Sequence, residues 1–158
     1  MGSIVAAVIG KLEEELRAVE RRALNAAEGA THEESRPEDP KDTRGLETSY
    51  LAHGLAQRAR ALESDIDTLR FLNVGPFNAT TPVTTGAKLE LEDEDGEVSH
   101  FVLLPCAGGT AVVVEGVTVR ILSPQSPLGG ALLERREGDD VEVRIAGKLR
   151  SYVIVSVR

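Results

Sequence analysis

The beginning of the chain carries apolar side chains at alternating steps of four and three residues, which is the spacing of a heptad repeat. The series consists of Val5, Ile9, Leu12, Leu16, Val19, Ala23, Ala26 and Ala30. Charged residues fill the faces between these positions, as a solvated helix surface requires. A helix with one apolar stripe must bury that stripe against a partner. The pattern therefore predicts a long helix that packs against another along its length.

A second helical series follows a polar stretch that contains Pro37 and Pro40. It consists of Leu51, Leu55, Ala59, Leu62, Ile66 and Leu69. Each predicted helix has about 26 residues and would be about 40 Å long. Matched lengths and a turn-forming connection favour an antiparallel coiled-coil hairpin within the chain. A heptad pattern alone also fits a coiled coil between two molecules.

The apolar period changes to two after Gly75-Pro76, which ends the helical region. Strands are predicted around Leu89 and Leu91, at 98–104, 111–114, 117–122 and 141–145, and finally at 152–157. Ser126-Pro127 is typical of an N-cap followed by a first-turn proline, and predicts a short helix through Leu133. We therefore expect an α+β protein: a hairpin arm at 1–75 and an antiparallel β domain with one short helix at 76–158.

The charge and cysteine content restrict the class of partner. The formal net charge of −8 argues against binding free nucleic acid, and we expect no sequence-specific DNA binding. Cys106 is the only cysteine, so an internal disulfide and a cysteine-rich zinc site are excluded. No apolar run reaches the length of a membrane span. We expect a cytoplasmic protein with no membrane partner and no tightly bound cofactor.

The segment ILSPQSPLGGALLERREGDDVEV, followed by the strand YVIVSV, resembles the C-terminal domain of the Gre-type (GreA and GreB) bacterial transcription elongation factors. That family shows a strand, a Ser-Pro pair opening a short helix, a Gly-Asp turn and two closing strands in this order. The predicted hairpin also fits the family's coiled-coil arm in position and approximate length. The resemblance thus covers nearly the whole chain, and it is most specific in the C-terminal half.

The resemblance implies an FKBP-like fold for 76–158, without prolyl isomerase activity. It also implies that the chain docks on bacterial RNA polymerase beside the secondary channel, with the arm inserted toward the active centre. There, acidic tip residues would help to hold a Mg²⁺ ion shared with polymerase and promote cleavage of backtracked RNA. The factor would meet the nascent RNA 3′ end only indirectly. Polymerase would remain the enzyme, and the chain would be an accessory factor.

The tip of the arm, around 31–50, reads THEESRPEDPKDTRGLETSY and is rich in carboxylates. Mg²⁺ prefers hard oxygen ligands such as these. By the resemblance, Asp42 and Glu47 correspond best to the family's acidic pair, with Glu38 and Asp39 as alternatives. Tyr50 and Arg44 are candidates to support the tip. Without the resemblance, acidic loop residues are more often solvated, or they cap a helix near its N-terminus.

The expected polymerase-binding residues lie between a strand and the short helix: Ser123, Pro124, Gln125, Ser126 and Pro127. A strand-to-helix connection explains these residues without any partner, and the resemblance adds the docking role. Two other functions stay open. The chain could block the secondary channel as an inhibitor without stimulating cleavage, because Pro37 and Pro40 indicate a lengthened or differently shaped tip. It could also be a coiled-coil interaction module unrelated to polymerase. No combination of nucleophile, base and orienting residue indicates a hydrolase.

Overall fold

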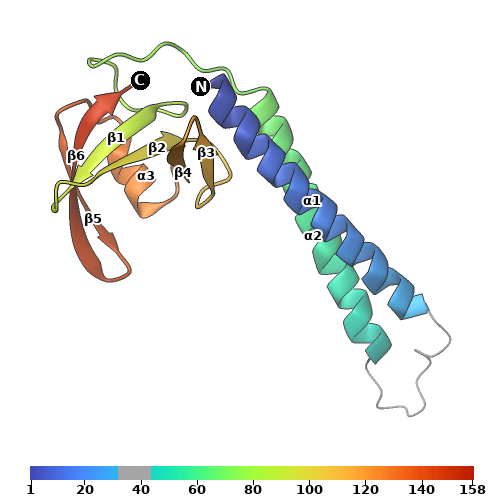
Figure 1. Ribbon diagram of the computed structural model, residues 1–158. Helices are drawn as coiled ribbons and strands as arrows, with labels where there is room; N and C mark the ends of the chain where they lie inside the picture. The colour runs from blue at the N-terminus through green and yellow to red at the C-terminus, as the bar shows by residue number, and fades with distance from the viewer. Residues whose placement is uncertain (32–43) are drawn as a thin grey trace. The chain divides into compact units, whose positions relative to one another are not determined.

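The secondary structure confirms the predicted α+β class. The computed structural model describes residues 1–31 and 44–158, with two long helices followed by a sheet and one short helix (Figure 1). Residues 10–67 form one compact unit, and residues 1–9 together with 68–158 form the other. The domain boundary at residue 75 stays a prediction. None of the helices in the described ranges is long and apolar enough to cross a membrane.

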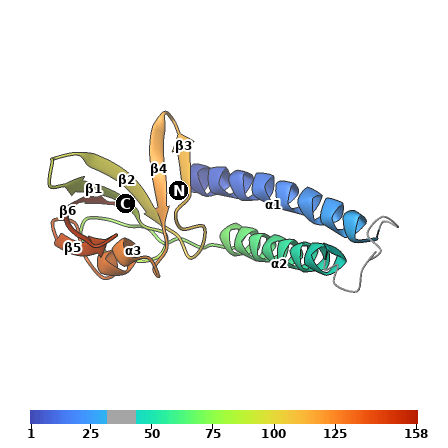
Figure 2. The same ribbon diagram turned by 90° about the horizontal axis from the view of Figure 1, so that it is seen from below.

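The two long helices are α1 (Gly2–Thr31) and α2 (Arg44–Arg70). They run side by side in opposite directions in both ribbon views (Figures 1 and 2). Within the 10–67 unit, Leu12 and Val19 of α1 and Leu62 and Ile66 of α2 are buried. Burial of these residues from both helices confirms the predicted apolar seam in this part of the arm.

The seam differs from the prediction at its two ends. Leu51 on α2 is 57% exposed rather than buried. The second half of the α1 seam carries the alanines Ala23 and Ala26, which offer little apolar surface to cover a leucine. Among the first nine residues, Ile4 and Val8 are buried while Val5 and Ile9 are only half-buried. These residues belong to the unit that contains the sheet, so the packing there selects a different face of the helix.

The sheet has strands close to those predicted. They are β1 (Lys88–Asp93), β2 (Val98–Leu103), β3 (Ala111–Val114), β4 (Val117–Leu122), β5 (Asp140–Ile145) and β6 (Lys148–Val157), with α3 (Pro127–Leu132) between β4 and β5. The last strand begins at Lys148 rather than at Tyr152. Ala146 and Gly147 both have positive φ, 49° and 81°, and this tight turn allows Lys148 to pair with Ile145 at once.

The strand order is β3-β4-β2-β1-β6-β5. In the described part of the chain, four of the five strand pairs are antiparallel, as expected. The β2–β4 pair is parallel, with Leu103 opposite Leu122, so the sheet is mixed rather than purely antiparallel. The reason is that β3 reverses the chain and β4 reverses it again. The chain therefore returns to the edge of β2 in the direction of β2 itself.

The core of the β domain lies between one face of the sheet and α3. Phe101 and Leu103 of β2 pack there with Leu128 and Leu132 of α3. The cluster also includes Val83, Ala87, Leu89, Leu91, Val141, Val143, Ile154 and Val157. The strict in-and-out alternation of β5 confirms that its predicted apolar face is the buried one. This packing fixes α3, and hence the loop that leads into it, against the sheet.

Candidate functional site

The loop from Ser123 to Pro127 joins the end of β4 to the start of α3. Ser126 is the N-cap of α3, with φ −74° and ψ 151°, and Pro127 occupies the first turn, as the sequence predicts. The Ser126 Oγ accepts a hydrogen bond from the Gly129 N–H at 3.1 Å and donates one to the Ser123 carbonyl at 2.8 Å. Proline costs nothing at this position, because the first helical N–H groups have no partner within the helix.

Backbone hydrogen bonds give the loop a tight turn. The Ser126 N–H donates to the Ser123 carbonyl at 3.0 Å, and the Gly130 N–H donates to the Ser126 carbonyl at 2.8 Å. Gln125 and Pro127 are exposed, whereas Ser123, Pro124 and Ser126 are half-buried. The loop therefore presents an amide and a proline ring outward. The Ser126 hydroxyl donates and accepts hydrogen bonds inside the loop, and these bonds shape the turn, while the docking role of Ser126 stays a prediction.

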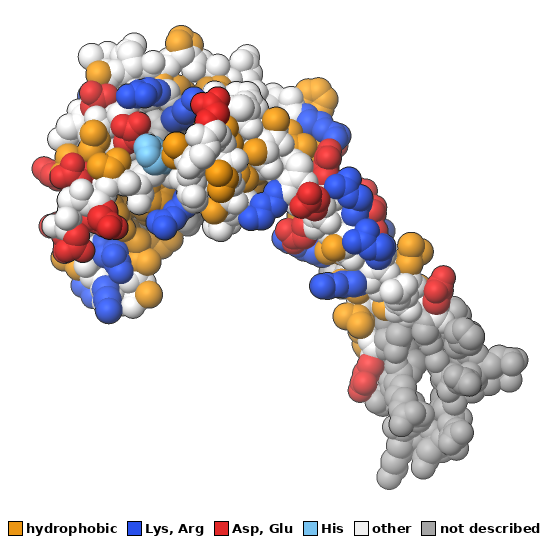
Figure 3. All heavy atoms as spheres, in the orientation of Figure 1, with side chains coloured by type: hydrophobic (Ala, Val, Ile, Leu, Met, Phe, Trp, Pro, Cys, Tyr) orange, Lys and Arg blue, Asp and Glu red, His pale blue; other side chains and the backbone are white. Residues whose placement is uncertain are grey.

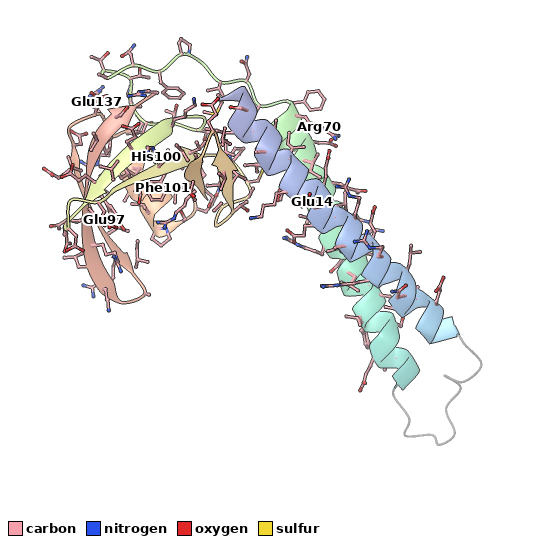
Figure 4. All side chains as sticks on the ribbon, in the orientation of Figure 1. Glu14, Arg70, Glu97, His100, Phe101 and Glu137 are labelled. Atoms are coloured by element: carbon pink, nitrogen blue, oxygen red, sulfur yellow. The ribbon has the colours of Figure 1, made fainter. Side chains whose placement is uncertain are left out.

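A groove of about 360 Å³ adjoins this loop and is lined mainly by apolar residues. Its lining includes Phe101, Ala111, Ile121, Leu122, Pro127, Leu128 and Ile145, with Arg120 as the charged member. Figure 4 labels Phe101 on β2. The groove could not be predicted from the sequence, because its residues come from β2, β3, β4, α3 and β5 and no local pattern connects them. An apolar side chain of a partner is the kind of group that it can hold.

The predicted tip residues fall partly outside the described residues. Asp42 and the alternatives Glu38 and Asp39 lie in the range that is not described. Arg44 is the first residue of α2, Glu47 is exposed in its first turn, and Tyr50 is 69% exposed. A carboxylate in the first turn is favoured by the positive end of the helix dipole. Tyr50 lies three residues after Glu47 and therefore on a neighbouring part of the helix surface.

The described residues do not by themselves form a metal site. Among them, no group of three or more His, Cys, Asp or Glu side chains is arranged to hold a metal ion. Glu47 offers the hard oxygen that Mg²⁺ prefers, but it would need further ligands from Asp42 or from a partner. The donor type at the tip thus fits Mg²⁺, while the geometry of the pair stays a prediction.

The surface of the arm carries charges of both signs. On the face shown in Figure 3, acidic and basic side chains are interspersed along the helices. Arg58 of α2 and Glu15 of α1 form an exposed ion pair, with the Arg58 Nη2 2.7 Å from the Glu15 Oε1. Both side chains are about half exposed, so solvent screens this pair and its contribution to stability is small. This distribution is typical of a solvated helical hairpin.

Comparison with known proteins places these features in a family. Residues 78–158, which contain the sheet, α3 and the loop, match the sequence model of the family described as "Transcription elongation factor, GreA/GreB, C-term". The chain is 30% identical over 154 residues to the transcription elongation factor GreA of Alkalilimnicola ehrlichii, which covers 94% of this chain and 91% of that protein. It is 29% identical over 150 residues to GreA of Methylococcus capsulatus, with the same two coverages.

A solved structure, the GreA factor homolog 1 (Gfh1) of Thermus thermophilus, aligns over 96% of this chain and 95% of that one. The sequence identity in that alignment is 24%, and the TM-score is 0.41. The match of residues 78–158 and the GreA relatives that span the chain agree with each other. The chain belongs to the GreA/GreB family of transcription elongation factors.

Proposed function

We propose that the chain binds bacterial RNA polymerase at the secondary channel and modulates elongation, as an accessory factor in the bacterial cytoplasm. The observation that carries this proposal is the capped Ser123–Pro127 loop beside an apolar groove, within the part of the chain that matches the GreA/GreB family. The relatives that span nearly the whole chain bear the name transcription elongation factor. The partner is therefore a protein surface rather than free nucleic acid.

The docking surface combines two kinds of contact. Gln125 and Pro127 are exposed at the loop, where an amide and a proline ring can meet a partner. The adjoining groove can bury an apolar side chain, which contributes affinity in proportion to the apolar area removed from water. Because the loop is held by the Ser126 cap, little ordering entropy is lost on binding.

The length of the helical arm determines how far its tip can extend. With 30 residues, α1 is about 45 Å long, and pairing with α2 stiffens it. A narrow helical hairpin of this kind can carry carboxylates at its tip into a confined channel. We propose that Asp42 and Glu47 act there, with Glu38 and Asp39 as alternatives and with Tyr50 and Arg44 as supporting residues.

We propose that the tip stimulates cleavage of backtracked RNA by the catalytic centre of polymerase. Asp42 and Glu47 would help to hold a Mg²⁺ ion there, and this ion would supply an activated water and charge stabilisation for the leaving oxygen. The role of this chain is to present carboxylate oxygens toward that ion, and Glu47 is exposed in the first turn of α2. The RNA 3′ end is affected only through the polymerase site.

A second function is favoured by the sequence of the tip itself. Pro37 and Pro40 lie in the connection, and four residues separate Asp42 from Glu47. A longer connection with widely spaced acids could obstruct the channel without holding the ion. The chain would then inhibit elongation while binding at the same place.

The first experiment measures binding of the full-length chain to bacterial core polymerase, in competition with a known secondary-channel factor. We expect the chain to displace that factor, and Gln125→Ala to weaken displacement because it removes the exposed amide of the loop. Asn73→Ala is the matched control, since Asn73 is also an exposed amide but lies far from the loop in sequence. Absence of any competition by the wild type would remove the polymerase proposal and leave the interaction module.

The second experiment measures RNA cleavage in backtracked complexes at saturating factor. Asp42→Asn with Glu47→Gln should reduce cleavage far more than polymerase binding, because the volume is kept and the charge is lost. The control is Glu14→Gln with Glu63→Gln, two acids on the exposed shaft of the arm. Equal cleavage by the wild type and the tip variant would reject these two residues. A wild type that binds, stimulates no cleavage and slows elongation would establish the inhibitor.

A further inference from the structure

The backbone of Ser123 lies against two glycines from different elements. A Cβ added to Gly129 of α3 would lie 2.0 Å from the Ser123 carbonyl oxygen. A Cβ added to Gly108, in the loop between β2 and β3, would lie 2.9 Å from the Ser123 Cβ and 3.2 Å from its backbone nitrogen. The distances of 2.0 Å and 2.9 Å are shorter than real Cβ atoms show, and the distance of 3.2 Å is tight. Glycine is therefore the residue that fits at these two places without a shift of Ser123.

Backbone conformation does not explain these glycines. Neither Gly108 nor Gly129 is among the residues with positive φ, the region that favours glycine. Gly129 lies in a helix, where glycine is less favourable than alanine. The absence of a side chain at Gly129 thus has a cost to the helix, and the space it leaves is filled by the Ser123 carbonyl.

Backbone hydrogen bonds join the β2–β3 loop, which contains Gly108, to the end of β4, where the Ser123–Pro127 loop begins. A clash between Gly108 and Ser123 therefore cannot be relieved by moving these two loops apart. The Leu104 N–H donates to the Leu122 carbonyl at 2.9 Å, just before each loop begins. The Gly109 N–H donates to the Ile121 carbonyl at 2.9 Å, and the Ile121 N–H donates to the Thr110 carbonyl at 2.8 Å. An added methyl group would therefore displace the Ser123–Pro127 loop itself.

We infer that Gly108 and Gly129 are positioning residues for polymerase docking: they seat Ser123 so that the loop presents Gln125 and Pro127 beside the apolar groove. This inference rests on the proposed function of the loop. Gly108 precedes β3 and Gly129 lies within α3, so the two glycines contact Ser123 from parts of the chain on either side of it in sequence. The Ser126 Oγ donates a hydrogen bond to the Ser123 carbonyl, and this bond closes the turn.

The test compares Gly129→Ala with Gly130→Ala in the full-length chain. Both substitutions add one methyl group to α3 and raise its helix propensity equally. They differ in space, because a Cβ on Gly130 would meet only the Pro124 carbonyl, at 3.2 Å. We expect Gly129→Ala to weaken binding to core polymerase by about tenfold or more, and Gly130→Ala to change it by less than about threefold. Equal affinity of the two variants would overturn the inference.

Amide chemical shifts of the free protein provide a readout that does not depend on polymerase. Gly129→Ala should move the amide signals of residues 123–127 well beyond the changes that Gly130→Ala produces. If the wild type itself does not bind polymerase, the proposed function fails, and this comparison still decides whether Gly129 positions the loop. Unmoved loop signals in Gly129→Ala would reject the positioning role.

Gly108→Ala provides a second variant if Gly129→Ala does not fold. Its added Cβ would meet the side chain of Ser123, so Ser123→Gly should relieve the clash. The double variant should therefore recover the affinity and loop signals of Ser123→Gly alone, whereas Gly108→Ala alone should not. Failure of this rescue would show that Gly108 does not act through Ser123.

Discussion

Replacing Ser126 by alanine tests how strongly the loop and α3 depend on a single hydroxyl group. The substitution removes the hydrogen bond from the Gly129 N–H and the one to the Ser123 carbonyl. Loss of an N-cap side chain costs about 1 kcal/mol, with a range of about 0.5–2 kcal/mol. The Ser123 carbonyl keeps the Ser126 N–H as a partner, so the second loss adds little. We expect Ser126→Ala to lower the free energy of unfolding by about 1–2 kcal/mol.

Equilibrium urea unfolding measures this difference, provided that the signal reports on the unit containing the sheet. The chain has two tyrosines and no tryptophan, with Tyr50 on α2 and Tyr152 on β6. In a Tyr50→Phe background, tyrosine fluorescence therefore follows Tyr152 alone. This separation matters because two units that unfold independently do not share one free energy of unfolding.

Ser126→Thr is the matched control, since threonine keeps the hydroxyl and suits the extended backbone at this position. It should retain the stability of the wild type within about 0.5 kcal/mol. If Ser126→Ala were as stable as Ser126→Thr, the cap would contribute nothing measurable and the reasoning would be refuted. The dependence of the free energy of unfolding on urea concentration should be unchanged, while the urea concentration at the midpoint should be lower. This result would assign the loss to the folded state rather than to a change in the compactness of the unfolded chain.

Two further predictions concern the core and the arm. Leu91 is fully buried in the sheet core, so Leu91→Ala should cost about 2–5 kcal/mol in the same urea assay. Leu149→Ala, at a residue that is 56% exposed, is its control and should cost under about 0.5 kcal/mol; similar losses for the two would contradict the assigned core. Arg58→Ala breaks the pair with Glu15, whose side chains are 52% and 46% exposed, and should change arm stability by under about 0.5 kcal/mol. The measurement is circular dichroism melting of the helices at low salt and at 1 M salt. A larger loss of stability at low salt would refute the interpretation that solvent screens the pair.

Local patterns were sufficient to predict the elements of this chain. The alternation of Val141, Val143 and Ile145 with charged neighbours predicts a strand with one buried face, and β5 has that face. Ser126-Pro127 predicts a cap and a first-turn proline, and both are present. These signals are reliable because hydrogen bonding and side-chain direction within one element depend on residues a few positions apart.

The pairing of strands that are not adjacent in sequence could not be predicted from local patterns. The parallel β2–β4 pair follows from two reversals of the chain, and no residue in either strand encodes which edge it will join. Likewise, Leu51 fits the heptad spacing, yet it is 57% exposed, because burial depends on what the opposite helix provides. The tip acids Asp42, Glu38 and Asp39 remain predictions from the sequence.

The sequence by itself determined the two periods of the chain, the helical arm, the strands and the capped loop, because each rests on local spacing and backbone chemistry. Only the tertiary structure decided that Phe101, Ile121, Leu128 and Ile145 share one groove, and that Gly108 and Gly129 both lie against Ser123. These residues are brought together by the packing of α3 on a mixed sheet. Contacts of this kind depend on distances between elements, which no local pattern specifies.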